Sequence, residues 1–385
     1  MNLNARRYDN GEPVRIEIDG ERIAAVTPAL PERDVTDWPF VAPGLFDLQI
    51  NGYGGIWFSD AELTPEMVVT AVEPYFQFGV TRLFPTLITN SFEGLAGGLS
   101  AIRTACEAHS WLEKVVAGCH VEGPYLSGED GPRGAHPKQH IRDPNWDEFQ
   151  KLQAISGGRI KLFTIAPEKN GAAEFIHRAV ATGVTISIGH TAANGEQIRA
   201  AVDAGATLST HLGNGAHAVL PRHPNYIWEQ LGEPRLAACI ISDGHHIPPS
   251  VISSIVRAKT PRRTIITCDA SGWAGCAPGE YENKLGRVEV LDDGRIVPAG
   301  QRTLLAGSGA GTDVCVTNAV RFAGVSLREA IDMAGQVPAR LVGLPEIALR
   351  CGSRADLFLY RSTNAAGGLR IEQTLVAGEV RYCRD

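Results

Sequence analysis

The stretch from Ile186 to Gly215 constrains the fold more than any other part of the chain. An apolar run ends at His190, a helical pattern follows over 195–204, and a second β-branched run ends at His211. This order predicts a parallel βαβ unit, in which both strand ends lie at the same rim of the sheet. One histidine alone is more typical of a capped strand end. Two at equivalent positions favour a metal site.

Strand and helix patterns alternate on both sides of this unit and predict an α/β fold. The predicted strands cover 44–50, 82–85, 115–121, 160–165, 185–189, 207–210, 237–242 and 264–268, and the predicted helices include 65–78, 95–109, 171–182, 195–204 and 249–258. Eight strands separated by helices indicate a (β/α)8 TIM-like barrel, which we place at residues 42–349. The segment 275–300 reads as a hairpin insertion, and 326–333 as a late helix that begins with a capping box.

The two ends of the chain show strand patterns of another kind, with alternating apolar and polar residues. Asp19-Gly20 marks a hairpin near the N-terminus, and Ala377-Gly378 marks a turn near the C-terminus. We therefore expect residues 1–41 and 350–385 to form one small β-sandwich domain.

Composition excludes several classes of function. A net charge of −7 gives no electrostatic basis for binding nucleic acid or an anionic membrane. The chain has no apolar leader and no apolar run of about 18 residues, so neither export nor a membrane span is expected. Eight scattered cysteines without a CxxC pair are typical of free thiols in a reducing cytoplasm, and a cytoplasmic location is expected.

Polar residues end the predicted strands repeatedly, and this is where a barrel carries its active site. Glu122 ends the third strand, His190 and His211 end the fifth and sixth, and Asp269 ends the last. Glutamate and two histidines are a common ligand set for a divalent ion that keeps one position open for water. A further carboxylate at the same rim can transfer protons between that water and a leaving amine, which indicates hydrolysis of an amide with Asp269 as general base and acid.

The motifs together resemble the amidohydrolase superfamily and, within it, the N-acetylglucosamine-6-phosphate deacetylase family. They run from APGLFDLQINGYGG through HVEGPYL, RGAH, TIAPE, GHTAA, THLGN, SDGHH and CDA to LAGS, in the family's order. The resemblance implies hydrolysis of the acetamide of N-acetylglucosamine 6-phosphate to glucosamine 6-phosphate and acetate. It assigns the metal to Glu122, His190 and His211, and proton transfer to Asp269. The substrate contacts that it implies are Ala135, His136, Asn214, Gly215, His246, Leu305, Ala306 and Gly307.

Two departures from the family patterns refine these expectations. Many superfamily members bind two metals through His-x-His after the first strand, where this chain has Gln49 and Asn51. Neutral amides are poor ligands for a second ion, so we expect one divalent ion per subunit, zinc before iron or another metal. The family's phosphate-binding arginine corresponds to Arg222, but its surroundings are changed. Since this arginine often reaches a neighbouring subunit, the resemblance also implies a homodimer.

Alternatives remain open at this point. The substrate could be an unphosphorylated or differently configured N-acetyl amino sugar, or the chain could be another amidohydrolase that acts on a cyclic amide. A barrel without catalysis, serving as a sugar sensor or scaffold, belongs to a different class. The retained Glu122, His190, His211 and Asp269 argue against it.

Overall fold

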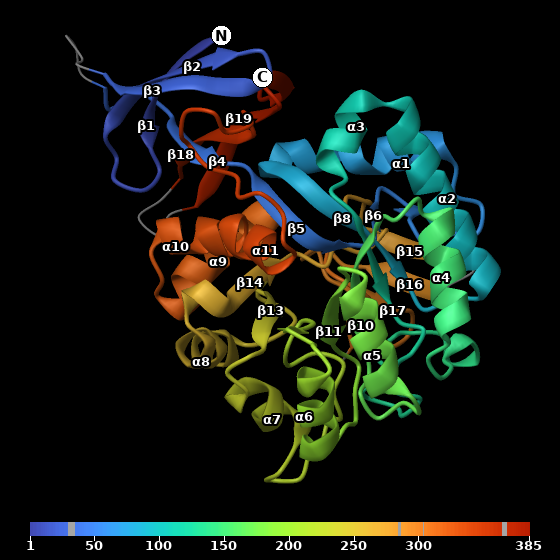
Figure 1. Cartoon of the computed structure of the whole chain (residues 1–385). Helices are drawn as coiled ribbons and strands as arrows, with labels where there is room; N and C mark the ends of the chain where they lie inside the picture. The colour runs from blue at the N-terminus through green and yellow to red at the C-terminus, as the bar shows by residue number, and fades with distance from the viewer. Residues whose placement is uncertain (30–34, 284–285, 303, 364–367) are drawn as a thin grey trace.

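The computed structural model describes residues 1–29, 35–283, 286–302, 304–363 and 368–385. Its centre is a barrel of eight parallel strands, as predicted, in the order β5-β8-β9-β10-β11-β12-β13-β14. These strands are β5 (Leu45–Ile50), β8 (Val80–Ile88), β9 (Cys119–Glu122), β10 (Ile160–Ile165), β11 (Thr185–Ile188), β12 (Leu208–Ser209), β13 (Ala237–Ile241) and β14 (Thr264–Thr267). Figure 1 shows the helices arranged around this barrel.

The barrel closes between β5 and β14, the strands that are farthest apart in sequence. Within the described residues, an isolated parallel bridge runs from Ile50 of β5 to Ala270, three residues after the end of β14. The buried carboxylate of Asp47 completes the seam, because it accepts hydrogen bonds from the Thr267 hydroxyl, the Cys268 amide at 2.9 Å and the Thr312 hydroxyl at 2.8 Å. Side-chain bonds to one carboxylate thus replace part of the backbone ladder.

Helices cover the outside of the barrel, and two of them begin with a capping box. They are α1 (Pro65–Val72), α2 (Phe92–Ala108), α3 (Ser110–Val115), α4 (Trp146–Ile155), α5 (Ala172–Ala181), α6 (Gly195–Asp203), α7 (Tyr226–Gly232), α8 (Pro249–Lys259), α9 (Thr312–Ala323), α10 (Leu327–Met333) and α11 (Gln336–Leu341). Capping boxes begin α6 at Asn194 and, as predicted, α10 at Ser326. Short 3₁₀ helices are η1 (Glu73–Phe78), η2 (Lys138–His140) and η3 (Pro261–Arg263).

Two sequence predictions fail in detail. The predicted strand 115–121 begins too early, because Val115 ends α3 and the strand starts only at Cys119. The predicted helix 65–78 divides into α1 and the 3₁₀ helix η1, whose second residue is Pro74. Proline cannot donate the backbone hydrogen bond that would continue an α-helix.

Both chain ends pair beside the barrel, as predicted; the expected β-sandwich is seen as one separate sheet of seven strands, and Figure 1 shows the N- and C-termini together on it. The seven strands follow the order β20-β19-β18-β4-β1-β2-β3. They are β1 (Asn2–Arg7), β2 (Pro13–Asp19), β3 (Arg22–Pro28), β4 (Phe40–Pro43), β18 (Leu357–Ser362), β19 (Leu369–Val376) and β20 (Glu379–Cys383). The domain boundaries at 41/42 and 349/350 stay predictions, and residues 30–34 and 364–367 within these ranges lie outside the described part.

The predicted insertion at 275–300 is a three-stranded antiparallel sheet of β15 (Gly279–Asn283), β16 (Gly286–Val290) and β17 (Ile296–Pro298). Residues 284 and 285 of this prediction lie outside the described residues. The sheet packs its apolar side on Trp57 and Trp273. Trp57 belongs to a two-stranded sheet that follows the first barrel strand, β6 (Gly52–Tyr53) with β7 (Ile56–Trp57).

All eight cysteines are free, as expected, and five of them are buried. Burial raises the pKa of the Cys106 thiol to about 12, so a buried thiol of this kind is inert. Among the described residues, no helix combines the length and the apolar content needed to cross a membrane.

Candidate active site

Four polar side chains meet at the carboxyl ends of the barrel strands. Glu122 is the last residue of β9, and His190, His211 and Asp269 each follow a strand by two residues. The last three have positive φ angles of 50°, 27° and 48°, a conformation that L-residues rarely adopt. Such backbone strain persists only where the surroundings enforce it, and it is common at functional sites.

The side chains of Glu122, His190 and His211 converge within hydrogen-bond distance of one another. The Glu122 Oε1 atom lies 3.0 Å from His211 Nε2 and 3.3 Å from His190 Nε2, and the two Nε2 atoms are 3.1 Å apart. Ligands about 2.0–2.1 Å from a tetrahedral zinc ion lie roughly 3.3 Å from each other. The spacing of the three atoms therefore fits one small cation.

The hydrogen bonding of His190 shows why this cluster needs a positive charge. Its Nδ1 atom lies 2.9 Å from the carbonyl of Pro132, which can only accept, so Nδ1 carries a proton. In the neutral ring the Nε2 lone pair then faces the carboxylate of Glu122. Two acceptors in contact require a proton or a metal cation between them. All three side chains are buried, so bulk water does not satisfy them.

Glu122 responds to this environment in the expected direction. Burial alone would raise the pKa of Glu122, but its close contacts with His190 and His211 hold it well below its usual range. A carboxylate that stays ionised while buried is a suitable cation ligand.

His136 also points into this cluster. Its Nε2 atom is 3.2 Å from His190 Nε2 and 3.7 Å from Glu122 Oε2, so Glu122, His136 and His190 form a second triplet that could hold a metal ion. Its Nδ1 atom contacts the Thr89 hydroxyl at 2.9 Å. Burial lowers the pKa of His136 to about 3, which keeps the ring neutral.

The two amides at the end of β5 face the two carboxylates. Gln49 donates from Nε2 to Glu122 at 3.0 Å, and Asn51 donates from Nδ2 to Asp269 at 2.8 Å. The amino groups rather than the carbonyls are directed at the acids, which is the arrangement of hydrogen-bond donors and not of metal ligands.

Asp269 is buried at the same rim. Burial and the nearby charge of Glu122 raise its pKa to about 7, while His211, His246 and the bond from Asn51 act in the opposite direction. A carboxyl group with a pKa near neutrality can both accept and return a proton under physiological conditions. A divalent cation bound beside Glu122 would lower this pKa.

The structure places most of the other predicted residues near this centre. A Cβ atom on Gly215 would lie 2.7 Å from the His190 ring, and one on Gly307 would lie 2.9 Å from Ser271. Ala135 is the exposed neighbour of the buried His136, and Asn214 donates to the carbonyl of His211 at 3.1 Å.

Arg222 differs from these residues, because it is exposed in a loop, and in the described part of the chain no hydrogen bond or ion pair of its side chain reaches the cluster. Ala306 donates its backbone amide to the Ile296 carbonyl of the inserted sheet at 2.8 Å, which ties the segment 305–307 to that sheet. His246 is positioned by Asp243, whose Oδ2 atom is 2.7 Å from its Nδ1.

Sequence reasoning missed the groups that orient these side chains. The Pro132 carbonyl and the Thr89 hydroxyl fix the rings of His190 and His136 from distant loops, and no local pattern marks them. Asp243 lies three residues before His246 within SDGHH, so its spacing could have identified it.

A further missed contact joins two loops on this face of the barrel. His217 Nε2 lies 3.2 Å from Glu129 Oε2, and the Tyr226 hydroxyl lies 2.9 Å from His217 Nδ1. The contact ties the glycine-rich loop 127–134 to the segment that follows His211.

Comparison with known proteins agrees with this geometry. The model of the amidohydrolase family matches residues 40–381, nearly the whole chain. The chain belongs to this family. Within it, the chain is 33% identical over 359 residues to N-acetylglucosamine-6-phosphate deacetylase of Homo sapiens, covering 90% of this chain and 84% of that protein. It is 31% identical over 360 residues to N-acetylgalactosamine-6-phosphate deacetylase of Escherichia coli O157:H7, covering 93% and 92%.

Solved structures of this amidohydrolase's relatives show the same architecture over their whole length. The N-acetyl-D-glucosamine-6-phosphate deacetylase of Mycobacterium smegmatis superposes with a TM-score of 0.87 at 32% identity, and 99% of each chain is covered. A variant of that enzyme in complex with N-acetyl-D-glucosamine-6-phosphate gives the same TM-score at 30% identity.

Proposed function

We propose that this amidohydrolase is a metal-dependent deacetylase that hydrolyses the acetamide of N-acetylglucosamine 6-phosphate to glucosamine 6-phosphate and acetate. The observation that carries the proposal is the convergence of Glu122, His190 and His211 within 3.0–3.3 Å, with Asp269 at the same rim. The likeness over the whole chain to deacetylases of amino-sugar phosphates supports this choice of substrate.

We assign the metal to Glu122, His190 and His211. His211 supports this set better than His136, since its Nε2 atom is 3.0 Å from the carboxylate against 3.7 Å for His136. His136 then remains free to contact the substrate. The donor orientation of Gln49 and Asn51 favours one ion per subunit, and the nitrogen and oxygen ligands suit zinc, with iron as the second choice.

When bound, a divalent ion of this kind polarises the acetamide carbonyl and lowers the pKa of a water molecule. The residues of the chain supply the proton transfers. Asp269 takes a proton from the attacking water and returns it to the amine that leaves. Asn51 holds the carboxylate of Asp269 in place. Asp243 accepts from His246 Nδ1, which directs the opposite nitrogen of that ring, Nε2, toward the substrate.

The remaining contacts with the sugar follow from position on this rim. Ala135, His136, Asn214, Gly215 and the segment 305–307 surround the cluster and form the substrate wall in this proposal. Arg222 binds the phosphate, and because it is exposed in the single chain, it does so across the interface of a homodimer. A cytoplasmic location agrees with the eight free cysteines.

The experiment that tests the function compares deacetylation of N-acetylglucosamine with and without the 6-phosphate, and of the N-acetylgalactosamine 6-phosphate epimer. We expect the phosphorylated glucosamine derivative to be turned over fastest. Preference for the epimer would favour the second candidate, which the likeness to the E. coli O157:H7 protein supports.

Two variants test the assignment of residues in the same assay. Asp269→Asn should abolish turnover while about one equivalent of metal per chain remains bound. Arg222→Ala should remove the preference for phosphate without changing kcat on the unphosphorylated sugar. Loss of the metal from Asp269→Asn would move Asp269 into the ligand set. An unchanged phosphate preference in Arg222→Ala would contradict the phosphate-binding role assigned to Arg222.

A further inference from the structure

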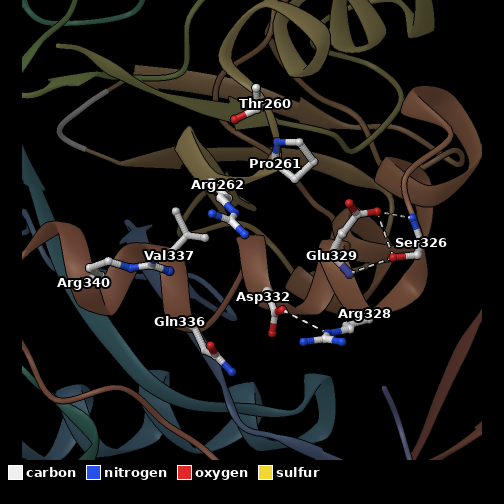
Figure 2. Close-up of a pocket in the computed structure, with 10 residues that line it drawn as sticks. All are labelled: Thr260, Pro261, Arg262, Ser326, Arg328, Glu329, Asp332, Gln336, Val337 and Arg340. Atoms are coloured by element: carbon white, nitrogen blue, oxygen red, sulfur yellow. Dashed lines mark hydrogen bonds and ion pairs between the residues drawn. The ribbon is translucent and has the colours of Figure 1, made fainter. Parts of the chain in front are cut away.

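A second cavity lies at the opposite end of the barrel from the candidate active site. Its volume is about 880 Å³, and its walls are η3, α10 and α11 (Figure 2). The element η3 leads directly into Thr264, the first residue of β14, whereas Asp269 follows the other end of that strand. The cavity is therefore separated from Asp269 by the length of a strand, and its size is that of a small-molecule site.

Three arginines line this cavity although the chain as a whole carries a net charge of −7. Figure 2 shows Arg262, Arg328 and Arg340 on different sides of it. The only ion pairs of Arg328 and Arg340 in the described residues are loose, with 3.8 Å to Asp332 and 3.7 Å to Glu346. Arg262 has no hydrogen bond or ion pair from its side chain in the part of the chain that the structure describes. These guanidinium groups keep most of their donors available.

The acidic residues of the cavity, in contrast, already have partners. Glu329 accepts from the backbone amide and the hydroxyl of Ser326, both at 2.8 Å, in the capping box of α10. Asp332 accepts from the hydroxyl of Tyr8 at 3.0 Å. These hydrogen bonds to uncharged donors hold both carboxylates in place, and within the described residues the only ion pair between them and the three arginines is the loose one of Asp332 with Arg328.

The backbone at the rim of the cavity is strained. Thr260, which links α8 to η3, has φ 63° and ψ 158°. This region is favoured by glycine and is an outlier for a β-branched residue. Its carbonyl accepts from the amide of Arg263 at 3.1 Å and from the hydroxyl of Thr264 at 2.9 Å, which holds the turn and directs the intervening segment into the cavity.

We propose that this cavity binds a small molecule that carries a phosphate group. Guanidinium groups match phosphate oxygens in bidentate geometry, and three of them line this cavity. The side chains of Gln336 and Thr260 supply polar groups, and Val337 supplies an apolar surface for the remainder of the ligand. The site is distinct from the substrate site, and its ligand would contact η3, α10 and α11.

The test is calorimetric titration of the metal-loaded protein with inorganic phosphate and with glucose 6-phosphate, which carries no acetamide. We expect saturable binding that Arg262→Gln and Arg340→Gln each weaken about tenfold, the loss typical of a charge-assisted hydrogen bond. The control Arg15→Gln removes the same charge from an exposed position on β2 and should change affinity by less than about twofold. Binding of the ester alone would show that contacts beyond the phosphate are needed.

Inhibition of deacetylation separates this cavity from the active site. Arg262→Gln should leave the competitive inhibition constant of glucose 6-phosphate unchanged while it weakens the calorimetric binding. The proposal is overturned if the wild-type protein shows no binding besides that at the active site, or if Arg262→Gln and Arg15→Gln bind alike. It is also overturned if calorimetric binding and inhibition weaken together, because the ligand then occupies the substrate site. None of these outcomes depends on which sugar the enzyme prefers.

Discussion

Replacement of Asp269 by asparagine should stabilise the metal-free protein at neutral pH. The pKa of this carboxyl group is about 7 in the folded chain, mainly because of burial, against 3.8 for an ordinary aspartate. Below pH 3.8 the group is protonated in both the folded and the unfolded state, and its ionisation does not change the free energy of unfolding. As the pH rises toward 7, the unfolded chain ionises while the folded chain keeps its proton, so the free energy of unfolding falls. Asparagine does not ionise, so the stability of the variant lacks this dependence on pH.

Each unit of difference in pKa corresponds to about 1.4 kcal/mol at 25 °C. The pH-dependent advantage of Asp269→Asn should therefore grow by about 2 kcal/mol between pH 5 and pH 7, and reach about 4 kcal/mol in total. The measurement is urea unfolding of chelator-treated parent and variant at pH 5, 6, 7 and 8. Parallel curves of stability against pH for the two proteins would refute the reasoning.

The same comparison with metal-loaded protein provides the control. A cation beside Glu122 stabilises the ionised form of Asp269, so the advantage of the asparagine variant should shrink or reverse. An advantage that persists unchanged with metal would show that no cation acts on this carboxylate.

Three further predictions concern other parts of the site. Asp243→Asn should destabilise the fold by about 2 kcal/mol at pH 7, because bonding to His246 lowers the pKa of this buried carboxyl from 3.8 to about 2; in acid-unfolding curves the difference should disappear as the pH falls from 3.8 to 2. Gly215→Ala should lower kcat by displacing the His190 ring, at a cost of about 1–3 kcal/mol. Gly232→Ala, whose new methyl group meets nothing within 4 Å, is its matched control, and equal kcat values would contradict this account. Removal of metal by a chelator should lower Tm and abolish turnover, and zinc should restore both; full activity in metal-free protein would exclude the proposed chemistry.

The barrel could be predicted because its signals are local. Apolar runs, capping residues and turn signals lie within a few residues of the elements they define, as with Ser326 at the start of α10. The failure at Val115 has a physical cause. Val115 and Val116 form a β-branched pair that resembles the start of a strand, but Val115 is the last residue of α3. Short runs of this kind are ambiguous between helix and strand.

The site was predictable in its residue types and not in its connections. Strand ends identified Glu122 and Asp269 because the topology carries them to one rim. The groups that orient the histidines come from distant loops; the Pro132 carbonyl, 2.9 Å from His190, is 58 residues away in sequence. A backbone carbonyl carries no sequence signature, so contacts of this kind emerge only in three dimensions.

The hydrogen bonds of Asp47 link closure of the barrel to the part of the chain that carries Asp269. The acceptor is made early in synthesis, but its donors Thr267 and Cys268 emerge from the ribosome some 220 residues later, immediately before Asp269. A nascent or truncated chain that stops short of this point lacks both the hydrogen bonds that close the barrel at Asp47 and the carboxylate that we propose transfers protons. Under the proposed mechanism, an incomplete polypeptide would therefore be inactive without any separate inhibitory element.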